Sequence, residues 1–450
     1  MTQAPDVKER YVAAFKAFAG NGAGAAPPWL HEIREGAIAR FTELGFPTMK
    51  QEEWRFTSVA PIAERQFALA RPDATRAPAP RDIDRFVPRA AGRRRLVFVN
   101  GRHVPALSAT DGLPAGVTAL GLAEACRHHG DLVRRHLGRY AGAPTPNAFT
   151  ALNTAFLDDG AFVHVATGVE MDEPLHLVFV TIPPPEPLVS HPRNVVVVER
   201  GARAAVVESY VALADGVYWT NAVTEVAVGE GARVEYCRVQ RESRDAFHVA
   251  ATHTHQARDS VLGCHPVALG GALSRHDVHT VLAGPGGHLT LNGLYLLGGG
   301  QHADHHTVID HAQPHCESHE YFNGVLDHRA HGVFNGRIIV RPGAQRTDSK
   351  QTNNNLLLST EARADSQPQL EIHADDVKCT HGSTVGPVDQ QQLFYLRSRG
   401  LSQETARGLL TYGFGTEILG RMPVGEVRSQ LDYLVRTWLA GGGAERRGAA

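Results

Sequence analysis

The run NVVVVERGARAAVVESY, residues 194–210, decides the fold class of this chain. Residues 194–198 and 205–210 are rich in β-branched and apolar side chains, which is typical of strands. Between them lies RGAR, residues 200–203, whose glycine indicates a tight turn. The run therefore predicts two strands joined by a short turn, with no helix between them.

The same kind of turn recurs along the middle of the chain, each time between strand-like runs. The intervals between the first glycines of successive turns are 30, 55 and 57 residues, counted from Gly201, Gly231, Gly286 and Gly343. The later two intervals are close to twice the first. A strand-turn unit with this period predicts a solenoid, most simply a β-helix, whose coils stack because one coil alone cannot bury its inner face. A sandwich of two sheets is the alternative architecture.

The remaining patterns divide the chain into three predicted domains, residues 1–150, 151–387 and 388–450. The first is mostly helical, with apolar residues at three- and four-residue spacing over 8–18 and 29–44. The second is the β-helix core. The third is helical, with Asp389 and Ser402 as N-caps of its first two helices and Gly400 between them. The fold class is therefore mainly β, with helical domains on both sides of the core.

Composition excludes several classes of protein. The 450 residues carry a net charge of −2, which argues against a protein that binds nucleic acid through phosphate contacts. No segment is long and apolar enough to span a bilayer, and the first residues, MTQAPDVKERY, do not resemble a signal peptide. Five scattered cysteines without a CxxC pair fit the reducing cytoplasm. No GxxxxGK[ST] motif is present, so any ATP is expected to be bound by another protein.

Histidine is unusually frequent in the core. Of the 25 histidines, 15 lie between His248 and His331. One interpretation is a metal-handling surface, because histidine is the commonest metal ligand. The other is polar side chains on exposed strands, which is favoured because no tight HxH-plus-acid signature recurs. His253-Thr254-His255 is the nearest approach to such a signature.

The chemically richest run is EIHADDVKCTHGSTVG, residues 371–386. Residues two apart in a strand face the same way, so Cys379 and His381 would project side by side. An imidazolium can hold a neighbouring thiol partly as thiolate, and such a pair suits sulfur transfer, metal ligation or nucleophilic attack. The spacing alone favours the ordinary interpretation, in which Cys379 is a small buried hydrophobe and His381 is a satisfied polar residue.

Longer motifs change this weighting. The run ADDVKCTHGSTVG (374–386), followed by DQQQLFYLRSRG (389–400), closely resembles the SufB/SufD family of iron-sulfur cluster assembly scaffolds. NNNLLLS (353–359) is similar to that family's core strands, and EEWRFT (52–57) looks like its SufD branch. Two features favour the SufD branch over the SufB branch. Phe394-Tyr395 is followed by Leu396, where SufB-type chains have a cysteine, and Cys379, His381 and Gly382 match the CxHG motif of SufD-type chains.

This resemblance implies a right-handed parallel β-helix that acts as a non-catalytic scaffold in the cytoplasm. It implies pairing with a SufB-type subunit, and docking of a SufC-type ATPase on the C-terminal helices. His381, and Cys379 beside it, would contribute to a transient iron-sulfur cluster at the interface between the two scaffold subunits. The residues expected to bind the ATPase are Phe394, Tyr395, Arg397 and Arg399.

Several points stay open at this stage. The resemblance does not say whether a reduced flavin joins the complex, or whether the chain alone forms a homodimer. A stand-alone metal-dependent β-helix enzyme, a lyase or hydrolase that uses the histidine-rich strands, is the alternative function. Only five lysines are present, so a basic catalytic set would have to rely on arginine. A purely structural interaction module, with Cys379 and His381 silent, is the third hypothesis.

Overall fold

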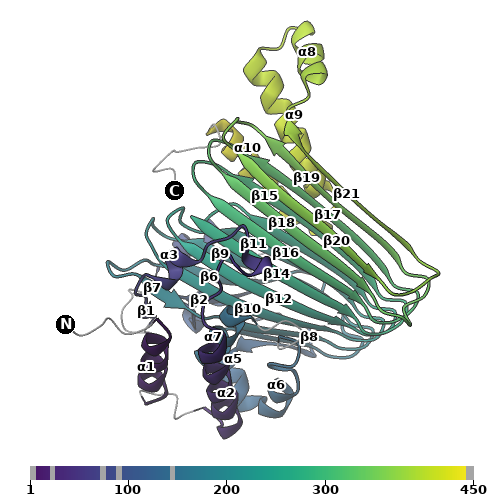
Figure 1. Cartoon of the computed structure of the whole chain (residues 1–450). Coiled ribbons are helices and arrows are strands. Elements are labelled where there is room, and N and C mark those ends of the chain that lie inside the picture. The colour runs from purple at the N-terminus through teal and green to yellow at the C-terminus, as the bar shows by residue number, and fades with distance from the viewer. Residues whose placement is uncertain (1–6, 21–25, 71–77, 88–93, 142–146, 442–450) are drawn as a thin grey trace.

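The computed structural model describes residues 7–20, 26–70, 78–87, 94–141 and 147–441. Its centre is a long stack of strands in two sheets (Figure 1). The first sheet contains, in spatial order, β20 Arg363–Ile372, β18 His331–Val340, β16 His302–His311, β14 Leu273–Leu282, β12 Phe247–Gln256, β10 Trp219–Val228, β8 Arg193–Val198, β5 Ala161–Val165 and β4 Val117–Gly121, with β7 Leu188–Ser190 and β1 Ala68–Leu69 beside this path. The second contains β21 Lys378–Pro387, β19 Asp348–Leu357, β17 Glu317–Leu326, β15 His288–Leu297, β13 Val261–Ala268, β11 Arg233–Arg241, β9 Arg203–Ala212, β6 Leu175–Thr181, β2 Arg95–Val99 and β3 Arg102–His103.

Successive strands of the core alternate between the two sheets, and each pairs in parallel with the strand one coil away. From Trp219 the in-register partners are Phe247, Leu273 and His302, which places one coil every 26 to 29 residues over this stretch. The recurring turns thus mark single and double coils, as their spacing predicted. About eight coils form a solenoid. The β-helix prediction is confirmed and the sandwich alternative is wrong, because a sandwich would not pair strands in parallel at a fixed register.

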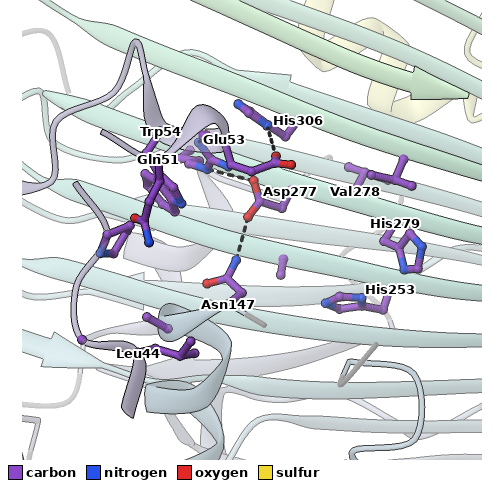
Figure 2. Close-up of a pocket in the computed structure, with 16 residues that line it drawn as sticks. Leu44, Gln51, Glu53, Trp54, Asn147, His253, Asp277, Val278, His279 and His306 are labelled. Carbon is purple, nitrogen blue, oxygen red and sulfur yellow. Dashed lines mark hydrogen bonds and ion pairs between the residues drawn. The ribbon is translucent and has the colours of Figure 1, made fainter. Parts of the chain in front are cut away.

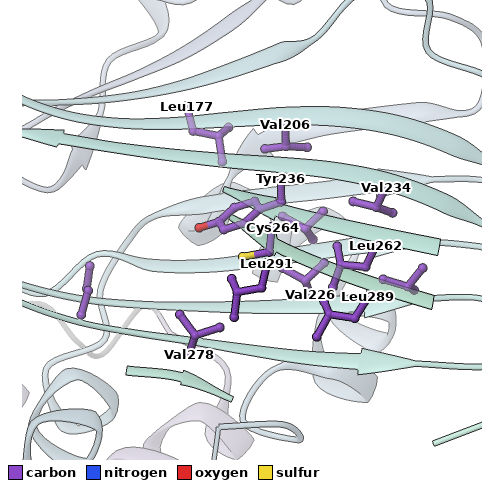
Figure 3. Packing of buried hydrophobic residues seen from close by; sticks show 14 of the residues in the cluster. Leu177, Val206, Val226, Val234, Tyr236, Leu262, Cys264, Val278, Leu289 and Leu291 are labelled. Carbon is purple, nitrogen blue, oxygen red and sulfur yellow. The ribbon is translucent and has the colours of Figure 1, made fainter. Parts of the chain in front are cut away.

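The core lies between the two sheets and is built from rows of in-register side chains. Figure 3 shows one such row, in which Tyr236, Cys264 and Leu291 follow one another on β11, β13 and β15. All three are fully buried. Burying each large apolar side chain contributes about 1.5–3 kcal/mol. Stacking of the apolar inner faces of successive coils therefore stabilises the fold, since each row is completed only by the coils above and below.

Helices cover the outer faces. The N-terminal region contains α1 Val7–Gly20, α2 Pro28–Leu44, η2 Glu52–Trp54, α3 Ala60–Ala63, α4 Pro80–Asp84, η5 Pro105–Leu107, α5 Leu122–His128, α6 Gly130–His136 and α7 Ala148–Ala155. Its larger part packs on the outer face of the first sheet, where Trp219 and Phe247 begin their strands and contact Phe67 and Phe149. Helix α4 and η5 pack instead against strands of the second sheet. The region also gives strands to both sheets, such as β4 to the first and β2 to the second.

The C-terminal region consists of α8 Gln390–Ser398, α9 Gln403–Gly420 and α10 Gly425–Ala440. Asp389 accepts hydrogen bonds from the backbone N–H groups of Gln391 and Gln392, and Ser402 accepts one from Thr405, so both predicted N-caps are confirmed. Helices α9 and α10 bury their apolar faces against the outer face of the second sheet. Helix α8 stands away from the solenoid (Figure 1).

No helix in the described part of the chain has the length and apolar character that crossing a bilayer requires.

Candidate functional site

The two last strands end the stack. Strands β20 and β21 pair with β18 and β19, and neither has a strand on its other side among the described residues. Most residues of β21 are exposed, whereas the earlier strands of the same sheet are largely buried. An edge of this length presents a row of unpaired backbone N–H and C=O groups, which is a template for pairing with another chain.

Cys379 and His381 both lie on β21, at this open end. Their in-register neighbours on β19 are Ser349 and Gln351. Cys379 is half-buried and packs against the apolar core between the sheets, so the side of β21 that carries both residues is the inner one. His381 is exposed. The structure thus places the two residues on one face of one strand, which is the arrangement that their spacing predicts.

The thiol of Cys379 is not activated in the isolated chain. Burial and the carboxylate of Asp348 raise the pKa of the Cys379 thiol above its usual value, although a hydrogen bond from the Ser349 backbone acts in the opposite direction. At neutral pH the group is therefore a thiol, and the hypothesis of a thiolate held by the imidazole is not supported by this environment. A metal ion would supply the missing charge, because ligation displaces the thiol proton.

The inner rows that end in these two residues change character over the last coils. One row runs Leu289, Ser318, Ser349 and Cys379, and the other runs Leu291, Glu320, Gln351 and His381. Ser318 and Ser349 share a hydrogen bond of 2.7 Å, and Gln351 Nε2 donates one of 2.6 Å to Glu320 Oε2. The apolar interior seen in Figure 3 thus becomes polar as it approaches the open end.

Glu320 and Gln351 were missed by sequence reasoning. Glu320 is 2% exposed and Gln351 1% exposed, and burial raises the pKa of the Glu320 carboxyl to about 7. Glu320 lies one coil before Gln351, which follows it by 31 residues, and Gln351 lies one coil before His381. A search for polar residues one and two repeat lengths before His381 would have found both.

The four residues expected to bind the ATPase lie on or directly after α8. Phe394 is 73% exposed and Tyr395 is 57% exposed, which is high for aromatic side chains. The guanidinium of Arg399 lies 5.3 Å from the centre of the Tyr395 ring. Arg397 is also exposed. Helix α8 thus carries apolar and cationic side chains that are largely exposed to solvent.

The histidines between His248 and His331 follow the strands rather than converging. Several are fully buried and bonded within the solenoid, such as His248 to Glu242 at 2.5 Å. Others lie in outward rows, such as His253 and His279, which are in-register neighbours. Among the residues that the structure describes, no three His, Cys, Asp or Glu side chains are arranged as a metal-ligand group.

A cleft of about 290 Å³ lies between the N-terminal region and the outer face of the first sheet (Figure 2). The guanidinium carbon of Arg275 lies 3.7 Å from the centre of the Trp54 ring. Arg275 in turn bonds Asp277 at 2.9 Å, and Asn147 donates to the same carboxylate at 2.8 Å. Arg275 and Asp277 are paired with each other within the chain. We therefore interpret the cleft as part of the packing that attaches the segment 52–57 to the solenoid.

Comparison with known proteins identifies the family of this chain. A family model described as "SUF system FeS cluster assembly, SufBD core domain" matches residues 181–414, and one described as "SufBD protein N-terminal region" matches residues 5–177. The chain belongs to the SufBD family. The core match includes β21 with Cys379 and His381, all of α8, and α9 up to Phe414. The SufBD family takes part in iron-sulfur cluster assembly.

SufBD relatives match over nearly the whole chain. An iron-sulfur cluster assembly SufBD family protein of Synechocystis sp. is 35% identical over 412 residues, which cover 89% of each chain. The iron-sulfur cluster assembly protein SufD of Escherichia coli is 32% identical over 384 residues, covering 85% of this chain and 86% of the relative. SufD of Bacillus subtilis is 28% identical over 415 residues, covering 90% and 93%.

Proposed function

We propose that this SufBD protein is a SufD-type scaffold subunit that helps to build an iron-sulfur cluster at its open end. It pairs there with a SufB-type subunit, and a SufC-type ATPase binds its C-terminal helices. The observation that carries the proposal is the exposed last coil, which holds a thiol and an imidazole on the inner face of an unpaired edge strand.

The chemistry of the two side chains supports this role. Thiolate and imidazole are both ligands that iron accepts in clusters. Two ligands cannot saturate a cluster, so the remaining ligands must come from the partner or from the cluster's own sulfide. A site at the end of a solenoid, where a second chain can continue the stack, satisfies that requirement without a closed pocket in either chain. The cluster is a product handed onward and not a resident cofactor of this chain.

Replacing His381 with alanine is expected to abolish cluster formation without preventing complex formation. His381 is exposed in the isolated chain, so its loss removes a ligand but little packing. The variant would be co-expressed with SufB- and SufC-type partners, purified without oxygen, and examined by visible absorption and iron content. His373→Ala, an exposed histidine next to β20, is the matched control. A chromophore that survives in the His381 variant would remove this residue from the site.

Replacing Phe394 with alanine is expected to weaken capture of the ATPase at least about tenfold, since buried aromatic anchors dominate many interfaces. The isolated chain should keep its unfolding midpoint, because the side chain is 73% exposed. Met49→Ala removes a large apolar side chain that is 53% exposed and lies outside the C-terminal helices, and it serves as the control. Equal capture by the Phe394 variant and the wild type would show that α8 is not the docking surface.

A further inference from the structure

The amide of Gln351 is held in one orientation. Its Nε2 donates to Glu320 Oε2 at 2.6 Å, so the NH₂ group of the amide faces Glu320. With Glu320 ionised, its carboxylate can only accept, and this orientation is the one that keeps the bond. The space for the amide is left by Gly336 on the facing sheet, where a Cβ would lie 2.3 Å from Nε2. Gln351 Oε1 is thereby directed away from Glu320.

That oxygen lacks a partner. Gln351 is 1% exposed, and its Oε1 accepts no hydrogen bond within the described structure. A buried acceptor left unsatisfied is destabilising, so an arrangement that enforces one calls for an explanation. The next residue in the row is His381 on β21, in register with Gln351. Neighbouring strands lie about 5 Å apart, which lets an imidazole on the same face reach the amide.

A histidine that ligates a metal through one ring nitrogen needs an acceptor for the N–H on the other. Such acceptors fix the tautomer and the ring orientation, and they raise the basicity of the ligating nitrogen. His381 is exposed in the isolated chain, so without an acceptor its ring would rotate freely and either nitrogen could carry the proton. The row supplies the missing group, because the acceptor lies one coil below and the carboxylate that orients it lies two coils below.

We propose that Gln351 and Glu320 are positioning residues for His381. The Gln351 amide oxygen accepts the His381 ring N–H, and Glu320 holds the amide in the orientation that makes this possible. The other ring nitrogen of His381 is then left bare for iron. The proposal rests on the role of His381 in the proposed function, and it extends the site two coils into the solenoid.

The test compares four variants in the co-expressed complex. Gln351→Met removes the amide at nearly constant volume, and Glu320→Gln removes the group that fixes its orientation. The double variant E320Q/Q351E exchanges the two groups, so that a carboxylate faces His381 while an amide supports it from below. Asn353→Leu is the control. Asn353 is 1% exposed and bonded through its amide to Tyr295, but its neighbour on β21 is Ser383 and not His381.

The expected result is that Gln351→Met keeps the complex and lowers iron and visible absorbance per complex about tenfold, the usual effect of removing such a support. Glu320→Gln should lower both less, and the exchanged pair should restore them to within about twofold of wild type. Asn353→Leu should leave the cluster intact. The thermal unfolding midpoint of each chain alone is measured in parallel, to separate loss of the cluster from loss of stability.

Three outcomes would overturn the proposal. A cluster retained in Gln351→Met but lost in His381→Ala refutes the positioning role and leaves the proposed function standing. A cluster retained in His381→Ala refutes both together. Gln351→Met and Asn353→Leu could also lose the cluster equally, with the loss following the drop in their thermal unfolding midpoints. That outcome would show that Gln351 contributes packing alone.

Discussion

Replacing Glu225 with alanine is expected to lower the free energy of unfolding by about 3–5 kcal/mol, the cost of breaking a buried ion pair by removing one partner. Glu225 and Arg193 are almost fully buried and joined at 2.6 Å. The same carboxylate accepts backbone hydrogen bonds from Gly138, Tyr140 and Ala141 at 2.7, 2.8 and 3.2 Å. The variant would leave a buried guanidinium and three N–H groups without their partner.

Urea unfolding followed by tryptophan fluorescence measures this effect, because Trp219 is buried at the start of the same strand. Glu230→Ala is the matched control. Glu230 is exposed in the turn that follows this strand, and its backbone carbonyl accepts a hydrogen bond from Gly201 that alanine preserves. The free energy of unfolding of the Glu230→Ala variant should differ from that of the wild type by less than about 0.5 kcal/mol. A similarly small loss for Glu225→Ala would mean that the pair contributes little to attaching the N-terminal region.

Replacing Glu320 with glutamine is expected to stabilise the isolated chain at pH 8 by about 3 kcal/mol relative to wild type. Burial raises the pKa of this carboxyl from 4.5 to about 7. Between those two pH values the folded chain keeps a proton that the unfolded chain has released. Wild-type stability therefore falls as pH rises through this window, and the full penalty is present above about pH 7. Below pH 4.5 the Glu320 carboxyl is protonated in both the folded and the unfolded chain, so the stabilising effect of glutamine disappears.

The measurement is the difference in unfolding free energy between variant and wild type at pH 4.5, 6 and 8, so that the titration of all other groups cancels. Glu361→Gln, in the exposed turn before β20, should show no such trend. A difference that does not vary with pH would show that Glu320 titrates normally. If Glu320→Gln stabilises the chain and also loses the cluster, stability and function make opposite demands on this residue. Such a trade-off is expected where a site retains a destabilising group for function.

Much of the fold follows from local pattern. The turn at Gly201 and its recurrence fixed the solenoid, because each coil repeats the same strand-turn unit. The caps Asp389 and Ser402 marked helix starts that the structure confirms, since an N-cap acts within one turn of its own helix. Side-by-side placement of Cys379 and His381 also needed only the two-residue period of a strand.

The assignment of those two residues to an iron-sulfur site did not come from local pattern. It came from the likeness of residues 374–400 to the SufB/SufD family, and the roles of both residues stay predictions. The division at residues 150 and 387 stays a prediction as well. Spacing alone favoured silent residues, because a thiol and an imidazole two residues apart occur in many strands.

The sequence by itself determined the coil, its approximate length and the helices that flank the stack. Only the tertiary structure decided which residues distant in the sequence meet: Glu225 with the loop after α6, and Glu320 with Gln351 below His381. Those contacts join residues about 30 to 90 positions apart. Their register depends on the length of every turn between them, since adding one residue to a strand's register would move its side chains to the opposite face.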